Sequence, residues 1–207
     1  MRYYMLNKPS GVVTAVRDKD SLTVMDCFPE EMRSGLHPVG RLDRDTEGLL
    51  IITDDGELTF RLTRPEFGIN KRYFFRAFGK ISSEDIAKLK KGGLLYGNNE
   101  EARPAFISDI STSTVENDLE HIPEESRAHC MKNPKGETFS AVITVSEGKR
   151  HEVKLLLKSV GCRIFYLKRI SMGDFVLDPM LKPGEFRKFN PVEIKTAEEY
   201  RKIYIKL

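Results

Sequence analysis

The chain has 207 residues, of which 40% are hydrophobic and 31% are charged, and its formal net charge is +3. This length suffices for one large domain or two small lobes with a sizeable core. The sequence has no apolar run of membrane-spanning length and no apolar region of the signal-peptide type at its start. The weakly basic balance permits a polyanionic partner without requiring one.

The cysteines indicate the compartment. Cys27, Cys130 and Cys162 are odd in number, widely spaced and in no metal-ligand pattern. Such cysteines are typical of reduced thiols, so we expect a cytoplasmic protein.

The first half of the chain predicts short strands alternating with short helices. In chain order we expect a strand, a short helix, extended chain, a strand, a helix and an aromatic-rich strand: residues 2–6, 22–27, 37–39, 49–53, 57–63 and 71–78. Ser82 followed three residues later by Asp85 is a helix-start signature, and Gly92 with Gly93 is expected to end that helix.

The second half contains the strongest helix pattern. Residues 148–160 place Val153, Leu156, Leu157 and Val160 on one apolar stripe. Upstream of it, residues 117–136 are acidic, carry two prolines and predict a long surface loop. The remaining predicted elements are five strands and a closing helix: residues 105–110, 112–116, 138–145, 163–170, 174–177 and 196–203.

Many strands with a few interspersed helices predict an α+β fold with a largely antiparallel central sheet flanked by helices. A doubly wound fold would require a regular alternation of strands and long helices, which the pattern lacks. We expect residues 1–207 to form one domain, with two sub-lobes and a cleft between them as an alternative organisation, since the sequence shows no clean linker.

The most polar motif runs from Gly40 to Gly48 and leads directly into the apolar strand at 49–53. Within it, Asp43 lies between Arg41 and Arg44, and flanking cations favour the carboxylate form of an acid. The strand gives the loop a rigid support. A solvated loop with surface ion pairs is the alternative interpretation.

A second charged feature surrounds the helix pattern. Seven Lys or Arg residues fall between positions 149 and 169, against the single acid Glu152. A solvated helix normally mixes charges of both signs, so this face favours an anionic partner such as a phosphate backbone, with a plain basic surface as the alternative. Lys154 is next to the apolar stripe and could turn inward to pair with a carboxylate.

Together these segments resemble RNA pseudouridine synthases of the RsuA type, which modify ribosomal RNA. The resemblance covers about residues 3 to 195 and rests on five motifs in order: Leu6–Gly11, Gly40–Gly56, Lys71–Tyr73, Glu147–Lys154 and Leu181–Arg187. It implies the pseudouridine synthase fold with a catalytic cleft, and a substrate of ribosomal RNA or a ribosomal subunit precursor, with a monomer favoured.

The resemblance also implies roles for individual residues. Asp43 would act on the ribose as nucleophile or base, Lys154 would keep it charged, and Tyr73 would stack on the target base and relay a proton. No metal or other cofactor is expected, because the isomerisation neither oxidises the base nor removes a group. The expected RNA contacts are Arg41, as a wedge, and the backbone-holding cations Arg44, Lys149, Arg150, Lys158 and Arg163.

Two features depart from the family pattern. This branch often carries an N-terminal S4 RNA-binding domain, which we do not expect in this chain; the catalytic body or a partner is then expected to hold the substrate, with a trimmed chain as the alternative. The family's Gln and second cation are replaced by Glu152 and Leu155. Two alternatives stay open: a catalytically silent rRNA-binding protein of the same fold, and a metal-dependent phosphodiesterase built on Asp43, Asp45 and Glu47.

Overall fold

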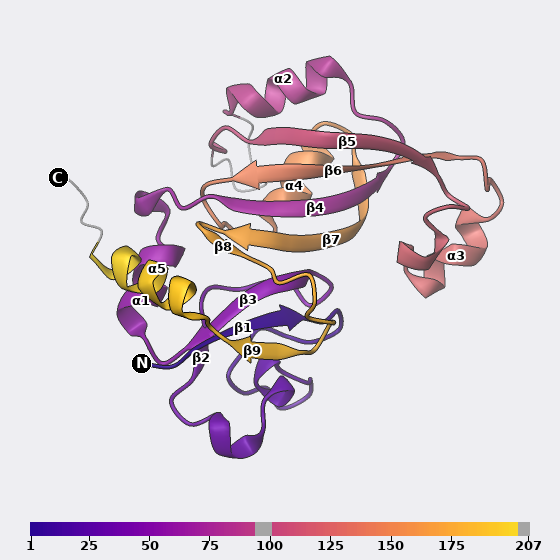
Figure 1. The fold of residues 1–207 in the computed structure, drawn as a ribbon. Helices are drawn as coiled ribbons and strands as arrows, with labels where there is room; N and C mark the ends of the chain where they lie inside the picture. Colours follow the sequence, from indigo (N-terminus) through magenta and orange to yellow (C-terminus); the bar gives the residue numbers. More distant parts are fainter. Residues whose placement is uncertain (94–100, 203–207) are drawn as a thin grey trace. The chain divides into compact units, whose positions relative to one another are not determined.

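The computed structural model describes residues 1–93 and 101–202, which fall into two compact units (Figure 1). The first unit combines Met1–Lys71 with Lys168–Leu207, and the second is Arg72–Leu167. Each unit mixes helices with a mainly antiparallel set of strands, which confirms the predicted α+β class. Within the described residues, no helix combines the length and the apolar character needed to cross a membrane.

The first unit is built on strands in the order β7-β3-β1-β9. The central strands β1 and β3 pair antiparallel over their whole length, from Tyr3 opposite Thr53 to Lys8 opposite Gly48. β3 also pairs in parallel with the second half of β7, while β9 and β2 pair antiparallel with β1 and β3 respectively. The bounds are β1 Tyr3–Lys8, β2 His37–Pro38, β3 Glu47–Thr53, β7 Arg163–Met172, β8 Phe175–Val176 and β9 Phe186–Lys188.

Both faces of the central strands are covered, which explains why most residues of β1 and β3 are apolar. On one face, the helices α1 (Gly56–Thr63) and α5 (Pro191–Arg201) lie side by side over a core that contains Leu49, Ile51 and Phe175 (Figure 1). On the other face, Phe28, which follows the 3-10 helix η1 (Val24–Cys27), stacks on Phe186 with ring centroids 4.0 Å apart. Two further 3-10 helices are η2 (Glu30–Met32) and η3 (Pro65–Phe67).

The second unit has strands in the order β5-β6-β4-β7, with the first half of β7 at one edge. β4 alternates buried residues with half-buried or exposed ones, and its buried Phe75 packs edge-on against Phe139 of β6, with ring centroids 5.6 Å apart. The helix α2 begins directly after its N-cap Ser82, which forms a capping box with Asp85, and ends before Gly92, as predicted. The bounds are β4 Lys71–Phe78, α2 Ser83–Lys91, β5 Phe106–Thr114, β6 Glu137–Val145 and α4 Glu152–Ser159.

The two strands predicted at 105–110 and 112–116 form one strand, β5. A register shift against β6 lies between Ser108 and Ser111, where Asp109 has a positive φ of 54°. This bulge interrupts the alternation of side chains along the strand. The sequence pattern therefore predicted two strands where the structure has one.

The acidic segment 117–136 was predicted as a long surface loop; most of its residues are exposed or half-buried, but part of it is helical. It contains the 3-10 helix η4 (Leu119–His121) and the helix α3 (Glu124–Cys130), at the end of β5 and β6 (Figure 1). The carboxylate of Asp118, 1% exposed, accepts hydrogen bonds from Arg76 of β4 and from Thr138 Oγ1 of β6. A buried, fully hydrogen-bonded acid therefore anchors the segment to the sheet.

The predicted helix 148–160 was wrong at its start. α4 begins at Glu152, because Gly148 and His151 adopt positive φ values of 119° and 56°. The buried Glu152 carboxylate reaches back and accepts a hydrogen bond of 2.7 Å from the backbone N–H of Gly148. Lys149, Arg150 and His151 therefore lie in a turn and not on a helical face.

The closing helix was also displaced in the prediction. α5 starts at Pro191, where Asn190 and Glu193 form a capping box, and it ends at Arg201. The last residue of the predicted range, 203, lies outside the described residues.

Candidate active site

Asp43 lies in the loop that connects β2 to β3. The loop makes a turn in which the N–H of Thr46 donates to the carbonyl oxygen of Asp43 at 3.1 Å. Leu42 and Thr46 are buried, whereas Asp43 is half-buried and Arg41 and Arg44 are exposed. Two buried anchors thus hold a loop that presents the carboxylates of Asp43 and Asp45 and two guanidinium groups.

A completely buried lysine supports the loop that carries Asp43. Lys8, the last residue of β1, donates from Nζ to the carbonyl oxygens of Pro9 at 2.9 Å, Arg44 at 3.1 Å and Thr46 at 2.9 Å. Burial lowers the pKa of Lys8 to about 8, although the nearby carboxylates of Asp45 and Glu47 act in the opposite direction. All three N–H donors of the ammonium group thus bind backbone carbonyl oxygens.

The segment that follows β1 holds the loop from a second side. Thr14 Oγ1 donates to the carbonyl oxygen of Leu42 at 2.8 Å and accepts from the N–H of the same residue at 3.2 Å. The N–H of Gly11 donates to the Arg44 carbonyl oxygen at 2.8 Å, and Arg44 Nε donates to the Gly11 carbonyl oxygen at 3.0 Å. The sequence analysis gave neither Lys8 nor Thr14 a role; the available signal was a lysine at the end of a strand that begins with four apolar or aromatic residues.

The loop enters β3 through a glycine that has no room for a side chain. Gly48 has a φ of 101°, and a Cβ atom there would lie 2.2 Å from the carbonyl oxygen of Arg169 on β7. Arg169 itself is buried and donates from Nε to the Leu49 carbonyl oxygen at 2.8 Å. The sequence counted Arg169 among the surface cations, which is wrong: its guanidinium is an internal support of β3.

The other two predicted catalytic residues belong to the second unit. Tyr73 lies on β4 and is 8% exposed, on the same strand face as Phe75 and Ala77. Lys154 lies in the first turn of α4 and is half-buried, next to the buried Val153. The alternation of β4 explains the position of Tyr73, and the apolar stripe of α4 explains the partial burial of Lys154.

The predicted RNA-binding cations of the second unit differ in their surroundings. Lys149 Nζ lies 3.3 Å from the carboxylate of the buried Glu147 and donates to the Glu101 carbonyl oxygen at 3.2 Å. Arg150, Lys158 and Arg163 are exposed. Lys149 thus has an internal ion pair, whereas these three side chains face solvent.

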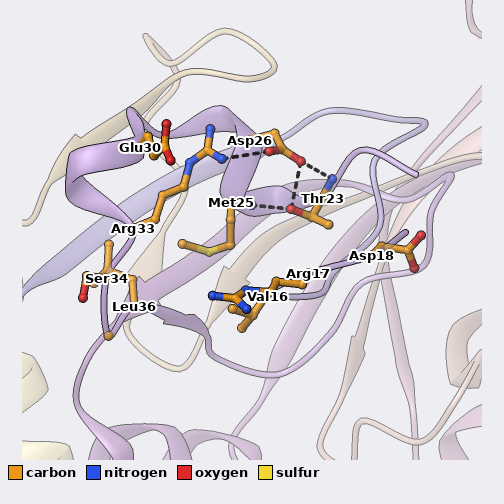
Figure 2. A pocket seen from close by; sticks show the side chains of 11 residues that line it. Val16, Arg17, Asp18, Thr23, Met25, Asp26, Glu30, Arg33, Ser34 and Leu36 are labelled. Atoms are coloured by element: carbon orange, nitrogen blue, oxygen red, sulfur yellow. Dashed lines mark hydrogen bonds and ion pairs between the residues drawn. The ribbon is translucent and has the colours of Figure 1, made fainter. Parts of the chain in front are cut away.

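The first unit also contains a cavity of about 730 Å³ that none of the predicted residues lines (Figure 2). On its wall, Asp26 accepts hydrogen bonds from the N–H of Thr23 at 2.8 Å and from Arg33 at 3.0 Å (Figure 2). These hydrogen bonds lower the pKa of Asp26, and those from Thr23 have the largest effect. The charged lining residues are two arginines and three acids: Arg17, Arg33, Asp18, Asp26 and Glu30.

Residues 1–93 and 101–202 contain no group of three or more His, Cys, Asp or Glu side chains arranged to hold a metal ion. The carboxylates of Asp43, Asp45 and Glu47 therefore do not form such a group in the described part of the chain.

Comparison with known proteins identifies the family. A family model described as RNA pseudouridylate synthase matches residues 2–159. The uncharacterized RNA pseudouridine synthase YtzG of Bacillus subtilis (strain 168) is 39% identical over 95% of this chain and 73% of its own length. Ribosomal small subunit pseudouridine synthase A of Escherichia coli (strain K12) is 32% identical over 95% of this chain and 74% of its own.

A solved structure agrees. A crystal structure of a pseudouridylate synthase superposes with a TM-score of 0.77 at 30% identity, covering 95% of this chain and 73% of that one. The predicted fold and the predicted family are both confirmed. The chain belongs to the RNA pseudouridylate synthase family of enzymes.

Proposed function

We propose that this chain converts a uridine of small-subunit ribosomal RNA to pseudouridine, with Asp43 as the residue that acts on the ribose. The observation that carries the proposal is the support of the Asp43 loop by the buried Lys8, which fixes the carbonyl groups on either side of Asp45. The substrate class is supported by the Escherichia coli relative, whose name specifies the small ribosomal subunit.

The reaction is an isomerisation with a closed balance of atoms. The bond from N1 of uracil to C1′ of ribose breaks, the base rotates, and a bond from C5 to C1′ forms. The proton on C5 leaves for solvent and N1 takes up a proton. A carboxylate suits the first step because it can attack C1′ or take the proton from C2′, and it is released unchanged at the end.

Asp43, Lys154 and Tyr73 have separate roles in the proposed reaction. Asp43 must be ionised at neutral pH, and the cation of Lys154 favours that state. Tyr73 offers a flat ring on which the detached uracil stays stacked while it turns, and its hydroxyl relays the proton from C5. The burial of Tyr73 and the partial burial of Lys154 support these assignments, because buried polar groups are kept where they have a partner or a task.

The target nucleotide must leave the base stack before the reaction, because the protein cannot reach the ribose of a stacked base. Extruding one nucleotide costs a few kcal/mol. Arg41 is exposed beside Asp43 and can fill the space left in the stack, while Arg44, Lys149, Arg150, Lys158 and Arg163 supply positive charge for phosphates.

The test is the release of tritium from RNA labelled at C5 of uridine, in the presence of EDTA. The wild-type protein should release tritium, and Asp43→Asn should release none. Asp45→Asn is the matched control, because it removes the same charge from the same loop at an exposed position; it should retain activity.

Each other result has a defined meaning. Equal loss in Asp45→Asn would contradict the assignment to Asp43. Cleavage of the RNA chain on replacing EDTA with a divalent ion, without tritium release, would favour the phosphodiesterase alternative. The assay is run on naked ribosomal RNA and on assembled small-subunit particles. Tight binding to both without tritium release from either would overturn the proposal in favour of a silent binding protein.

A further inference from the structure

A pocket of about 400 Å³ lies in the second unit, where the segment 117–136 returns to the sheet. The sheet contributes Phe78 of β4 and Arg163 at the start of β7, and the segment contributes its last residues. The main lining side chains are Phe78, Val115, His129, Lys132, Asn133 and Arg163. Arg163 is assigned above to phosphate binding; the other lining residues are used neither by the sequence motifs nor by the proposed reaction.

The floor of the pocket is aromatic. Phe78 is half-buried, and its ring lies 4.7 Å from that of Phe165, centroid to centroid. The guanidinium of Arg163 lies over the Phe78 ring, 5.8 Å from its centroid. The pocket thus combines a ring held by a second ring with a planar cation, both of which are platforms for nucleobases.

The rim of the pocket carries positive charge. Lys132 and Arg163 are exposed, and the acid at the rim, Glu137, is paired with Lys80 at 2.7 Å. The cavity of the first unit differs, because its acids outnumber its arginines (Figure 2). Of these two cavities, the pocket at Phe78 is the one with a charge that suits a polyanion.

The pocket is held in shape by hydrogen bonds within the segment. The N–H of Val115 donates to the Gly136 carbonyl oxygen at 2.9 Å, and the N–H of Gly136 donates to the Asn133 carbonyl oxygen at 2.9 Å. At the other end, Asp118 ties the segment to β4 and β6. A rigid pocket loses little entropy when it binds a ligand.

We propose that this pocket holds an unpaired nucleobase of the RNA, outside the target uridine, with the base stacked on Phe78 and its phosphate bound by Lys132 and Arg163. The proposal rests on the proposed function for the identity of the ligand as RNA. The volume lies within the range of small-ligand pockets. Stacking tolerates any base, because every base has an aromatic face.

The first test uses a single-stranded oligonucleotide of alternating adenosine and cytidine, which contains no uridine to react. Its affinity is measured by fluorescence anisotropy over a series of salt concentrations. Lys132→Gln should weaken binding and reduce the salt slope by about 1. Lys135→Gln is the matched control: it removes the same charge three residues away, outside the pocket lining, and should change neither value.

Phe78→Leu tests the stacking. It keeps an apolar side chain and should weaken binding by at least about fivefold, at the lower end of base–aromatic stacking. Because this variant loses a ring contact with Phe165, an independent reading on the wild-type protein is needed. The same oligonucleotide should slow the alkylation of Cys130, which lines the pocket, more than that of Cys27 in the first unit.

Equal weakening by Lys132→Gln and Lys135→Gln would overturn the proposal, since it would show a diffuse charge effect. Unchanged alkylation of Cys130 at saturating oligonucleotide would overturn it as well. Tritium release separates this proposal from the proposed function. If the wild-type protein releases tritium but Lys132→Gln binds the oligonucleotide with normal affinity, only the proposed pocket is contradicted. If Lys132→Gln binds the oligonucleotide more weakly but the wild-type protein releases no tritium, only the proposed reaction is contradicted.

Discussion

The ammonium nitrogen of Lys8 lies 2.9 Å from the carbonyl oxygen of Thr46, inside the core. The bond joins the end of the first strand to the loop of Asp43, 38 residues later in the chain. Lysine is almost never fully buried unless it is paired, and here the partners are backbone carbonyl groups. The first strand therefore sets the position of the loop that carries the proposed reaction.

Lys8→Met should destabilise the protein and slow the reaction. The variant leaves the Thr46 carbonyl group without this donor, and an unsatisfied buried group costs about 1–3 kcal/mol. Urea unfolding measures the free energy of unfolding, and tritium release measures activity. Lys19→Met, at an exposed position, is the control and should behave as the wild type. Full stability and full activity in Lys8→Met would show that the loop does not depend on this bond.

The same lysine predicts a pH dependence. Burial lowers the pKa of Lys8 from its ordinary 10.5 to about 8. Between these values the unfolded chain holds a proton that the folded chain has released, so stability rises with pH. The free energy of unfolding of the wild type, minus that of Lys8→Met, should therefore increase from pH 8 to pH 10.5. A flat or falling difference over this interval would contradict the lowered pKa.

Gly48→Ala should destabilise the first unit by at least about 2 kcal/mol, because it adds a clash to a strained backbone. The new Cβ would lie 2.2 Å from the backbone of Arg169 at a φ of 101°. Gly56→Ala is the control, since a Cβ there meets no atom within 4 Å and its φ is not positive. Thermal unfolding compares the two variants. If both variants unfold at similar temperatures, the backbones of β3 and β7 can move apart at Gly48 without loss of stability.

Elements with a local signal were predictable from the sequence. The Ser82–Asp85 capping box fixed the start of α2, because cap and helix lie within four residues of each other. The apolar run at 49–53 identified β3, because a strand buried on both faces needs apolar residues throughout. Asp43 was proposed in the same way, from a motif contained in one loop.

Elements that depend on distant contacts were not predictable. α3 has no apolar stripe, and Asp118 anchors its segment through Arg76, 42 residues earlier in the chain. α4 starts late because His151 takes a left-handed conformation, which composition does not signal. The burial of Lys8 and Arg169 also depends on backbone partners far away in the chain, and a lone cation in a sequence usually indicates surface.

Lys154→Met should lower kcat for tritium release, because the proposed reaction uses Lys154 as the cation that partners Asp43. Lys158→Met removes the same charge from an exposed position of the same helix and is the comparison. Since Lys158 is proposed to bind phosphate, its loss should raise KM and leave kcat unchanged. An equal fall of kcat in both variants would assign the effect to overall charge and not to Lys154.

Tyr73→Phe separates the two roles proposed for this side chain. It keeps the ring and removes the hydroxyl, so KM should change little while kcat falls by about 100-fold or more, the scale of a lost proton relay. Tyr73→Leu removes the ring as well and should also raise KM, by the equivalent of roughly 1–3 kcal/mol of base stacking. Both constants are measured from the release of tritium at C5.

The control for this pair is Tyr166→Phe, which removes a hydroxyl from another tyrosine of the second unit and keeps its ring contact with Phe74. It should leave kcat and KM unchanged. An unchanged kcat in Tyr73→Phe would remove the hydroxyl from the reaction and leave Tyr73 as a stacking platform. An unchanged KM in Tyr73→Leu would remove the platform too, because the buried ring would then serve the core of the second unit alone.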